Sequence, residues 1–263
     1  MVNSIAPSRV LRFAALVELG TSGLSACTME DPALPSLVLP PRIDHVEAWV
    51  FDLDNTLYPA SCSLFPQIDI RMRQFIATAL HLSLDDAFVL QKKYYHHYGT
   101  TLRGLMLMHH IEPAEFLAYV HDIDCGVLDP APRLDAVLGR LPGRKIIYTN
   151  GSERHARNVL DRLGLTRHFG DIFDIQAADF IPKPNAESYA LMVRRHAVDG
   201  KRAAMFEDLP RNLAPAAAIG MTTVLVRENG HSHWTAPEDT DLSHVDHVTD
   251  DLAGWLEMVA PSA

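Results

Sequence analysis

Residues 46–56 read VEAWVFDLDNT, and this stretch decides the fold of the chain. Its first part, Val46–Phe51, is a short run rich in valine and aromatic side chains, which predicts a buried strand. Polar residues crowd the end of that strand. Because side chains of an extended chain point alternately to opposite sides, the carboxylates of Asp52 and Asp54 can reach one side while Leu53 turns away. The stretch therefore predicts a pair of carboxylates at the carboxyl end of a buried strand.

Similar strand-like runs follow along the chain, and helical patterns separate them. The runs lie at Lys145–Tyr148, Ile172–Ile175, Ala203–Phe206 and Thr222–Val226, with a weaker one at Val245–Val248. The helical patterns lie at Glu153–Leu163, Ala186–His196, Asn212–Ile219 and Asp251–Val259. Strands that alternate with helices of this length predict an α/β fold with a doubly wound parallel sheet.

The exception is the segment between the first two predicted strands, which contains no convincing strand pattern. It predicts helices at Phe65–Leu80, Leu84–Tyr98, Leu102–His109, Ala114–Val120 and Pro132–Arg140. Such a segment is too long for a loop inside a compact domain. We therefore expect a helical cap domain at residues 59–130, inserted after the first strand of a core domain made of residues 45–58 and 131–263. Residues 1–44 are expected to form a flexible leader and linker.

The leader carries a weak export-like pattern. Arg9 and Arg12 precede a short apolar stretch, Phe13–Val17, and Leu24–Cys27 resembles the box at which bacterial lipoproteins are cleaved and acylated. Polar residues and a glycine interrupt the apolar stretch, whereas a signal peptide needs about 7–15 continuous apolar residues. We favour a flexible leader, or translation that starts at Met29, over export.

The composition bounds the possible partners. A formal net charge of −10 argues against a nucleic-acid partner, since binding a phosphate backbone needs clustered Lys and Arg. No run reaches the roughly 18 uninterrupted apolar residues of a membrane span. The three cysteines are scattered, which favours reduced thiols in the cytoplasm over a disulfide framework. We expect a cytoplasmic monomer or homodimer that acts on a small molecule, without a membrane or nucleic-acid partner.

Reactive residues follow four of the predicted strands, and ligands of open α/β sheets bind beyond the carboxyl ends of strands. Asp52 and Asp54 follow the first strand. Residues 149–152, Thr-Asn-Gly-Ser, follow the second, where a hydroxyl, small residues and helix N-terminal amides suit a phosphate group. Lys183 stands between two prolines after the third strand, and Glu207–Asp208 ends the fourth.

From Val46 to the C-terminus this ordered set resembles the haloacid dehalogenase superfamily. The resemblance implies that Asp52 is a nucleophile and a metal ligand and that Asp54 is the general acid and base. It implies that Thr149 binds phosphate, together with Asn150 and Gly151. Lys183 is then the cation that holds the phosphate and the nucleophile together.

The resemblance also implies a metal site. Asp208 would be a ligand beside Asp52, and Asp54 would contribute its backbone carbonyl. Glu207 either binds the metal or orients its neighbours. Independently of any family, so many carboxylates cannot crowd one cleft as anions without a compensating cation, and oxygen ligands of this kind suit Mg²⁺. We therefore expect Mg²⁺ as the cofactor.

Asp54 separates two kinds of chemistry within the superfamily. A departing halide needs no proton, and dehalogenases typically lack this second aspartate. A departing alkoxide needs a proton, which Asp54 can supply. Asp54 therefore favours phosphate esters as substrates.

Two stretches, Asp52–Pro59 and Tyr98–Gly104, resemble the pyrimidine 5′-nucleotidase branch of the superfamily. This implies nucleoside monophosphates such as UMP or CMP as substrates, and Arg103 is the candidate for contacting the phosphate or the base. The cap histidines, at 96, 97, 109 and 110, are interpreted as surface or packing residues and not as a metal site. The alternatives are a phosphatase or phosphomutase for another small ester, such as a sugar phosphate, and a non-catalytic phosphate-binding adaptor.

Overall fold

The computed structural model describes residues 43–227 and 241–261, which belong to one compact unit, Pro40–Ala263. The predicted leader and its export-like pattern lie outside the described residues, apart from positions 43 and 44. Within the described residues, none of the helices is both long and apolar enough to cross a membrane.

A parallel sheet forms the centre of this unit. Its strands are β1 (Ala48–Phe51), β2 (Arg144–Tyr148), β3 (Asp171–Phe173), β4 (Ala203–Glu207), β5 (Thr222–Val226) and β6 (His247–Thr249). They lie in the order β3-β2-β1-β4-β5-β6, and every neighbouring pair is parallel. The predicted doubly wound parallel sheet is therefore confirmed, and β1 lies between β2 and β4.

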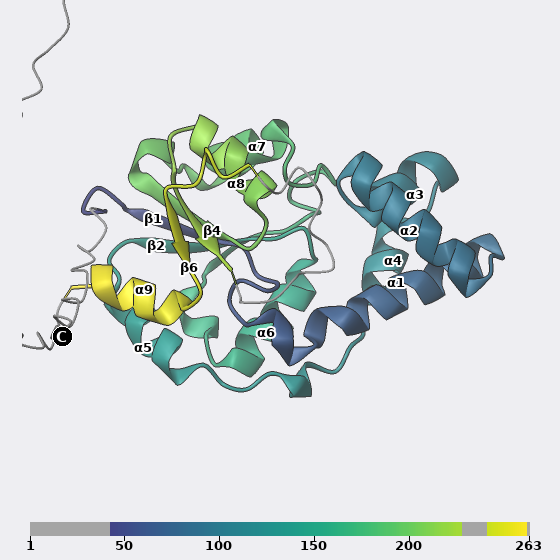
Figure 1. Ribbon diagram of the computed structural model, residues 1–263, viewed down its shortest axis with the longest axis horizontal. Coiled ribbons are helices and arrows are strands. Elements are labelled where there is room, and N and C mark those ends of the chain that lie inside the picture. Colours follow the sequence, from purple (N-terminus) through teal and green to yellow (C-terminus); the bar gives the residue numbers. More distant parts are fainter. Residues whose placement is uncertain (1–42, 228–240, 262–263) are drawn as a thin grey trace, which may run out of the picture. The chain divides into compact units, whose positions relative to one another are not determined.

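The alternating side chains of β1 supply the cores on both faces of the sheet. Trp49 and Phe51 pack with α5 (Pro132–Arg140), α6 (Glu153–Leu163) and α9 (Leu252–Val259) on one face. Val50 packs on the other face with α7 (Ala186–His196) and α8 (Pro210–Ala218). Figure 1 shows these two helical layers on opposite sides of the strands. Burying each such large apolar side chain stabilises the fold by about 1.5–3 kcal/mol.

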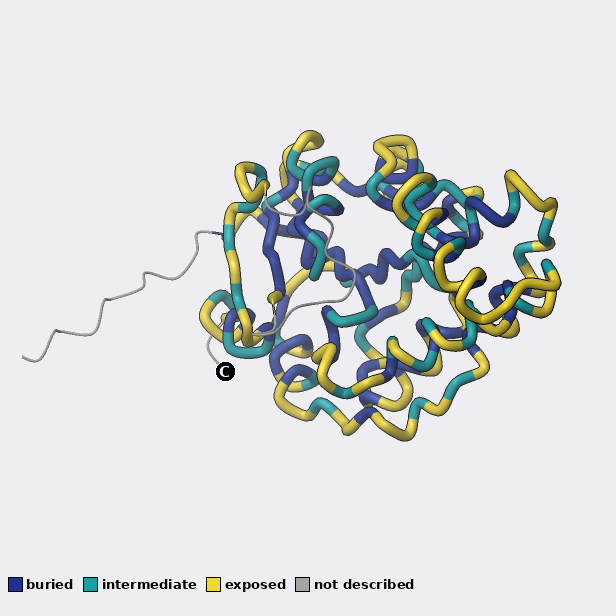
Figure 2. Tube along the Cα trace, turned by 45° about the vertical axis from the view of Figure 1, so that its right-hand side comes forward, coloured by how far each residue is buried: buried dark blue, intermediate teal, exposed yellow. Residues whose placement is uncertain are grey.

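The insertion after β1 is helical, as the sequence predicts. It contains α1 (Leu64–Leu80), α2 (Leu84–Tyr98), α3 (Thr101–His109) and α4 (Pro113–Val120). These helices have a core of their own, in which the rings of Phe75 and Phe116 pack edge to face with their centroids 5.2 Å apart. Figure 1 shows them beside the sheet, and Figure 2 shows exposed outer turns around buried inner ones. The exact boundaries of the cap, residues 59–130, stay a prediction.

Short 3₁₀ turns complete the described chain, at η1 (Ala60–Cys62), η2 (Cys125–Val127), η3 (Thr166–His168) and η4 (Gly200–Arg202). The observed elements differ from the predicted ones mainly at their ends. β1 begins at Ala48, two residues after the predicted start. α8 begins at Pro210 and not at Asn212, because a proline fits the first turn of a helix, where its missing N–H is not needed.

Candidate active site

Three neighbouring strands bring the predicted reactive residues to one edge of the sheet. Asp52 follows β1, Thr149 follows β2, and Glu207 is the last residue of β4. The ladder continues into the site, because the backbone N–H of Asp52 donates to the carbonyl of Phe206 at 2.9 Å. The position of the Asp52 carboxylate is thus fixed by the rigid centre of the sheet.

Lys183 joins this edge from the loop between β3 and α7. Its ammonium group donates to Asp52 Oδ1 at 2.7 Å, to Glu207 Oε1 at 2.7 Å and to the carbonyl oxygen of Tyr148 at 3.0 Å. The residue is 2% exposed. Burial by itself lowers the pKa of Lys183, but the two carboxylates outweigh it and hold the pKa above its ordinary value. Lys183 is therefore a buried, permanently charged cation in contact with Asp52.

Asn150 holds the backbone of Lys183. Its Oδ1 accepts from the N–H of Lys183 at 2.9 Å, and its Nδ2 donates to the carbonyl of the same residue at 3.4 Å. The hydroxyl of Thr149 accepts from the N–H of Gly151 at 2.9 Å, which leaves the proton of that hydroxyl for another acceptor. Both polar atoms of the Asn150 side chain are thus used to hold the backbone of Lys183. The hydroxyl of Thr149 can still donate a hydrogen bond to a phosphate oxygen.

The carboxylate oxygens of Glu207 already have partners. Oε1 accepts from Lys183 and from Asn212 Nδ2 at 2.6 Å, and Oε2 accepts from the N–H of Leu209 at 2.7 Å. Burial raises the pKa of Glu207, but the charge and hydrogen bond of Lys183 outweigh that effect and lower it. With these partners, Glu207 is a buried anion in direct contact with Lys183.

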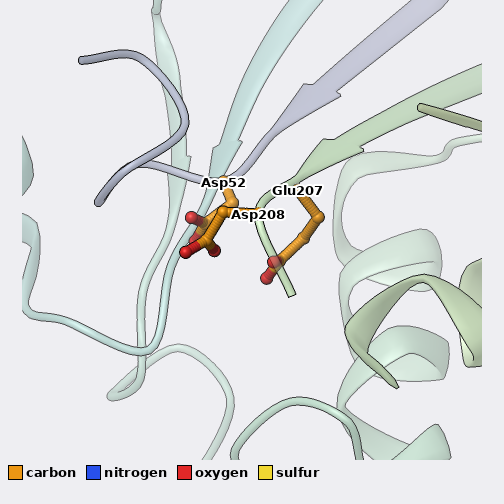
Figure 3. A group of neighbouring side chains, drawn as sticks. All are labelled: Asp52, Glu207 and Asp208. Carbon is orange, nitrogen blue, oxygen red and sulfur yellow. The ribbon is translucent and has the colours of Figure 1, made fainter. Parts of the chain in front are cut away.

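Asp52, Glu207 and Asp208 form a cluster in which ligand oxygens lie within 4.8 Å of one another (Figure 3). With Lys183, three carboxylates and one ammonium leave an excess of two negative charges when all are ionised. Burial, opposed by Lys183 and helped by Glu207, raises the pKa of Asp52 to about 7. Burial and the neighbouring Glu207 and Asp52 also raise the pKa of Asp208. An all-oxygen cluster with uncompensated negative charge fits a hard divalent cation such as Mg²⁺.

Asp54 lies in different surroundings, two residues after Asp52. Its Oδ1 accepts from Tyr58 Oη at 2.5 Å and from His155 Nε2 at 2.8 Å. Burial raises the pKa of Asp54, but the His155 charge and the hydrogen bonds from His155 and Tyr58 outweigh it, so the pKa lies below its ordinary value. The two aspartates of the first motif therefore have separate partners and shifts in opposite directions.

No pattern in the sequence singles out His155, Tyr58 or His121 as site residues. His155 lies in the first turn of α6, whose N-cap Ser152 accepts from its N–H. His121, just after α4, stacks on the ring of His155 with centroids 4.5 Å apart and planes 10° from parallel. Burial, and then the charge of His155, lower the pKa of His121 to about 3. The only signal in the sequence was the position of His155 in the first turn after the Thr149–Ser152 segment.

Between this edge and the insertion lies a cavity of about 140 Å³. At roughly 10–15 Å³ for each enclosed water, it has room for about ten waters or a small phosphorylated molecule. Asp52, Asp54, Thr149 and Lys183 line one end. The opposite wall belongs to the insertion and is mainly apolar, with Phe65, Ile68, Met72, Leu102, Phe116, Leu117 and Val120, but it also contains Tyr95, Thr100, Thr101 and His121.

Arg103 is not among the residues that line this cavity. Its Nη1 donates to the carbonyl of Phe180 at 3.2 Å, and it lines a neighbouring pocket with Pro182 and Asn185. In this arrangement Arg103 ties α3 to the loop that carries Lys183. Its contact with a substrate stays a prediction.

Comparison with known proteins identifies a family for this chain and several solved structures with a similar fold. Residues 46–220 match the family model of haloacid dehalogenase-like hydrolases. "Phosphate metabolism protein 8" of Saccharomyces cerevisiae is 26% identical over an alignment of 197 residues, with 68% of this chain and 61% of that protein covered. This chain thus spans less than two thirds of that relative.

Solved structures resemble the fold at low identity. CbbY from Rhodobacter sphaeroides, in complex with phosphate, has a TM-score of 0.55 at 17% identity, with 81% of this chain and 99% of that chain covered. A HAD phosphatase from Thermococcus onnurineus has a TM-score of 0.53 at 17% identity, covering 81% and 98%. L-2-haloacid dehalogenase from Xanthobacter autotrophicus has a TM-score of 0.51 at 16% identity, also covering 81% and 98%. Phosphatases and dehalogenases both share this fold, so the choice between their chemistries depends on the site.

Proposed function

Since the chain belongs to the haloacid dehalogenase-like hydrolase family, we propose that it is a Mg²⁺-dependent phosphomonoesterase that acts through an aspartyl-phosphate on Asp52. One observation carries the proposal. The ammonium of Lys183 lies 2.7 Å from the Asp52 carboxylate, and the oxygens of Asp208 belong to the same cluster. A phosphate group placed against Asp52 would meet a fixed cation and a site for a divalent one.

In the first step, a carboxylate oxygen of Asp52 forms a bond to phosphorus while the bond from phosphorus to the ester oxygen breaks. Asp54 gives a proton to that departing oxygen, and the negative charge of the bound phosphate is what favours the protonated form of Asp54 at this step, against the lowered pKa of the free site. In the second step, Asp54 takes a proton from water as the water attacks phosphorus, and the bond to Asp52 breaks. Inorganic phosphate leaves, Asp52 returns as a carboxylate, and Asp54 is protonated again.

The other residues at the Asp52 end of the cavity would hold the phosphate. Lys183 and the hydroxyl of Thr149 would bind phosphate oxygens, with the N–H groups of Asn150 and Gly151 nearby. Asp52, Asp208 and the backbone carbonyl of Asp54 would hold Mg²⁺, and Glu207 would orient Lys183 rather than bind the metal. When bound, Mg²⁺ supplies charge that screens the anionic phosphate from the anionic nucleophile.

Asp54 favours a phosphate ester over a halogenated acid as the substrate. A halide leaves without a proton, so a dehalogenase has no need for a proton donor beside the nucleophile. Here two donors, Tyr58 and His155, hold Asp54 in place at the cavity. A non-catalytic phosphate-binding adaptor would need neither this donor nor the nucleophile.

For the substrate we propose a nucleoside monophosphate, with pyrimidine nucleotides such as UMP or CMP as the first candidates. The wall opposite Asp52 contains the apolar side chains of α1 and α4 and offers a face for a flat base. Sugar hydroxyl groups placed against these apolar side chains would lack hydrogen-bond partners, which is unfavourable, so a sugar phosphate would depend on the polar lining residues Thr100 and Thr101. A phosphatase or phosphomutase for such an ester is therefore the second candidate.

Phosphate release from a panel of nucleotides and sugar phosphates tests the proposal. We expect hydrolysis that needs Mg²⁺, stops on chelation, and is fastest with a nucleoside monophosphate. Asp52→Asn should reduce turnover by at least about 10³-fold, because the nucleophile is lost. Asp85→Asn, at an exposed position in the first turn of α2, is the matched control and should keep full activity. Full activity of Asp52→Asn, or no hydrolysis of any ester by the wild type, would overturn the proposal.

A further inference from the structure

The two oxygens of the Asp54 carboxylate have different surroundings. Oδ1 accepts two hydrogen bonds, from Tyr58 Oη and His155 Nε2. Among residues 43–227 and 241–261, no group donates to Oδ2. The carboxylate is therefore held through Oδ1. Oδ2 can exchange a proton with a substrate or water in the cavity that Asp54 lines.

We infer that His155 is a positioning residue for proton transfer, whose Nε2–H holds Asp54 so that Oδ2 faces the ester oxygen. The inference rests on the proposed function, in which Asp54 moves the proton. It assigns a role to a histidine that is not part of the resemblance described above.

The alternative is that His155 only fills space at the start of α6. The ring is fully buried, and within the described part of the chain its Nδ1 has no hydrogen-bond partner. An unpartnered buried polar atom destabilises a protein by about 1–3 kcal/mol, a loss that an aliphatic side chain would avoid. The bond from Nε2 to Asp54 is the contact that an aliphatic side chain could not make.

His155 is fixed from two sides. Its backbone N–H donates to the N-cap Ser152, and the same hydroxyl lies 2.8 Å from His121 Nδ1. The ring of His121 stacks on that of His155, and His121 also lines the cavity. The chain leaving α4 therefore packs directly against the residue that holds Asp54, so the insertion supports the proton-transfer side of the site.

The way in which kcat/KM of His155 variants depends on the leaving group distinguishes a positioning role of His155 from a purely structural one. The ratio kcat/KM reports steps up to the first cleavage of the ester bond. Nitrophenolate leaves well without a proton, whereas an alkoxide does not. Loss of Asp54 positioning should therefore reduce kcat/KM for the best alkyl phosphate of the panel but not for p-nitrophenyl phosphate.

We test this with His155→Asn, whose amide is too short to reach Asp54, and His155→Gln, whose amide nitrogen is as many bonds from the backbone as Nε2. For the alkyl ester, His155→Asn should reduce kcat/KM by about 30- to 100-fold, within the range for general acid catalysis. His155→Gln should recover most of that loss. For p-nitrophenyl phosphate, both variants should stay within about 3-fold of the wild type, since that cleavage does not depend on the donor.

His168→Asn is the matched control, because His168 Nε2 lies 2.7 Å from Asp135 Oδ1 away from the cavity. It should not change the ratio between the two esters. If His155→Asn does not fold, as judged by thermal unfolding, His155→Leu takes its place. Equal losses for both esters, no loss, or no rescue by Gln would overturn the inference. In contrast, a wild type that hydrolyses neither ester would overturn the proposed function itself.

Discussion

The two aspartates of the first motif, two residues apart, lie in two differently built halves of the site. Asp52 belongs to a half built by the ends of β1, β2 and β4, with Lys183 and Glu207 buried beside it. Asp54 belongs to a half built by helix starts and connections, with Tyr58, His155 and the stacked His121.

The difference teaches how one short motif can supply two functions. In the half around Asp52, negative charge exceeds positive charge, and burial raises the pKa values of Asp52 and Asp208. In the half around Asp54, burial also raises the pKa of Asp54, but the charge of His155 and the hydrogen bonds from His155 and Tyr58 outweigh that effect. One half is therefore suited to bind cations and the phosphate, and the other to hold a single carboxylate in place.

Lys183→Met should give the largest effect, because among the described residues Lys183 is the only cation that pairs with Asp52 and Glu207. Two buried carboxylates would then lack their counter-charge, which typically destabilises a protein by about 3–5 kcal/mol. Turnover should fall by at least about 10³-fold, because phosphate would also lose its fixed cation. Urea unfolding and phosphate release measure the two effects.

Lys201→Met is the matched control for this variant, since Lys201 is exposed on η4. It should leave stability within about 0.5 kcal/mol of the wild type. If Lys183→Met keeps a tenth of the wild-type turnover, the half around Asp52 does not work as described.

Glu207→Gln and Asp208→Asn separate the roles of two adjacent acidic residues within that half. Glu207 uses both oxygens for Lys183, Asn212 and Leu209, so Glu207→Gln should reduce kcat by about 10- to 100-fold through misplacement of Lys183. The Mg²⁺ concentration for half-maximal activity should hardly change. Asp208→Asn should raise that concentration by at least about 10-fold, since it replaces the anionic oxygen of the proposed metal ligand with a neutral amide oxygen.

Titration of activity with Mg²⁺ measures both variants in the same way. A shift of equal size in Glu207→Gln and Asp208→Asn would mean that Glu207 is a metal ligand as well. The proposal that Glu207 orients Lys183 while Asp208 binds the metal would then be wrong.

The sequence was most informative where backbone geometry leaves little choice. Parallel strands end at one edge of a sheet, so residues that follow strands must converge there. Asp52, Thr149 and Asp208 follow strands or end them, and the structure brings them together with Lys183 around one cavity. The helices of the insertion were readable for a similar reason, because their apolar side chains recur with the period of a helix.

The remaining contacts depend on side-chain directions that no periodic pattern encodes. The ring of His155 reaches Asp54 across 101 positions of sequence, and its place depends on how α6 begins. Asn150 holds the backbone of Lys183, 33 positions away, through its side chain. Arg103 turns to the carbonyl of Phe180, which composition and spacing do not indicate. Loop paths and ring packing decide these contacts.

Met72→Ala should give the smallest effect and tests a third region, the apolar wall. Met72 lines the cavity from α1 and is only partly buried, so its loss should hardly affect folding. A shorter side chain would remove contact with a base, and we expect KM for UMP to rise by about 10-fold, the lower end for lost apolar contact. KM for glycerol phosphate, which has no base, should stay unchanged. Met108→Ala, at a residue on α3 that is 54% exposed, is the matched control. Equal increases for both esters would mean that the wall does not select the leaving group, and that selectivity arises beside Asp52 and Asp54.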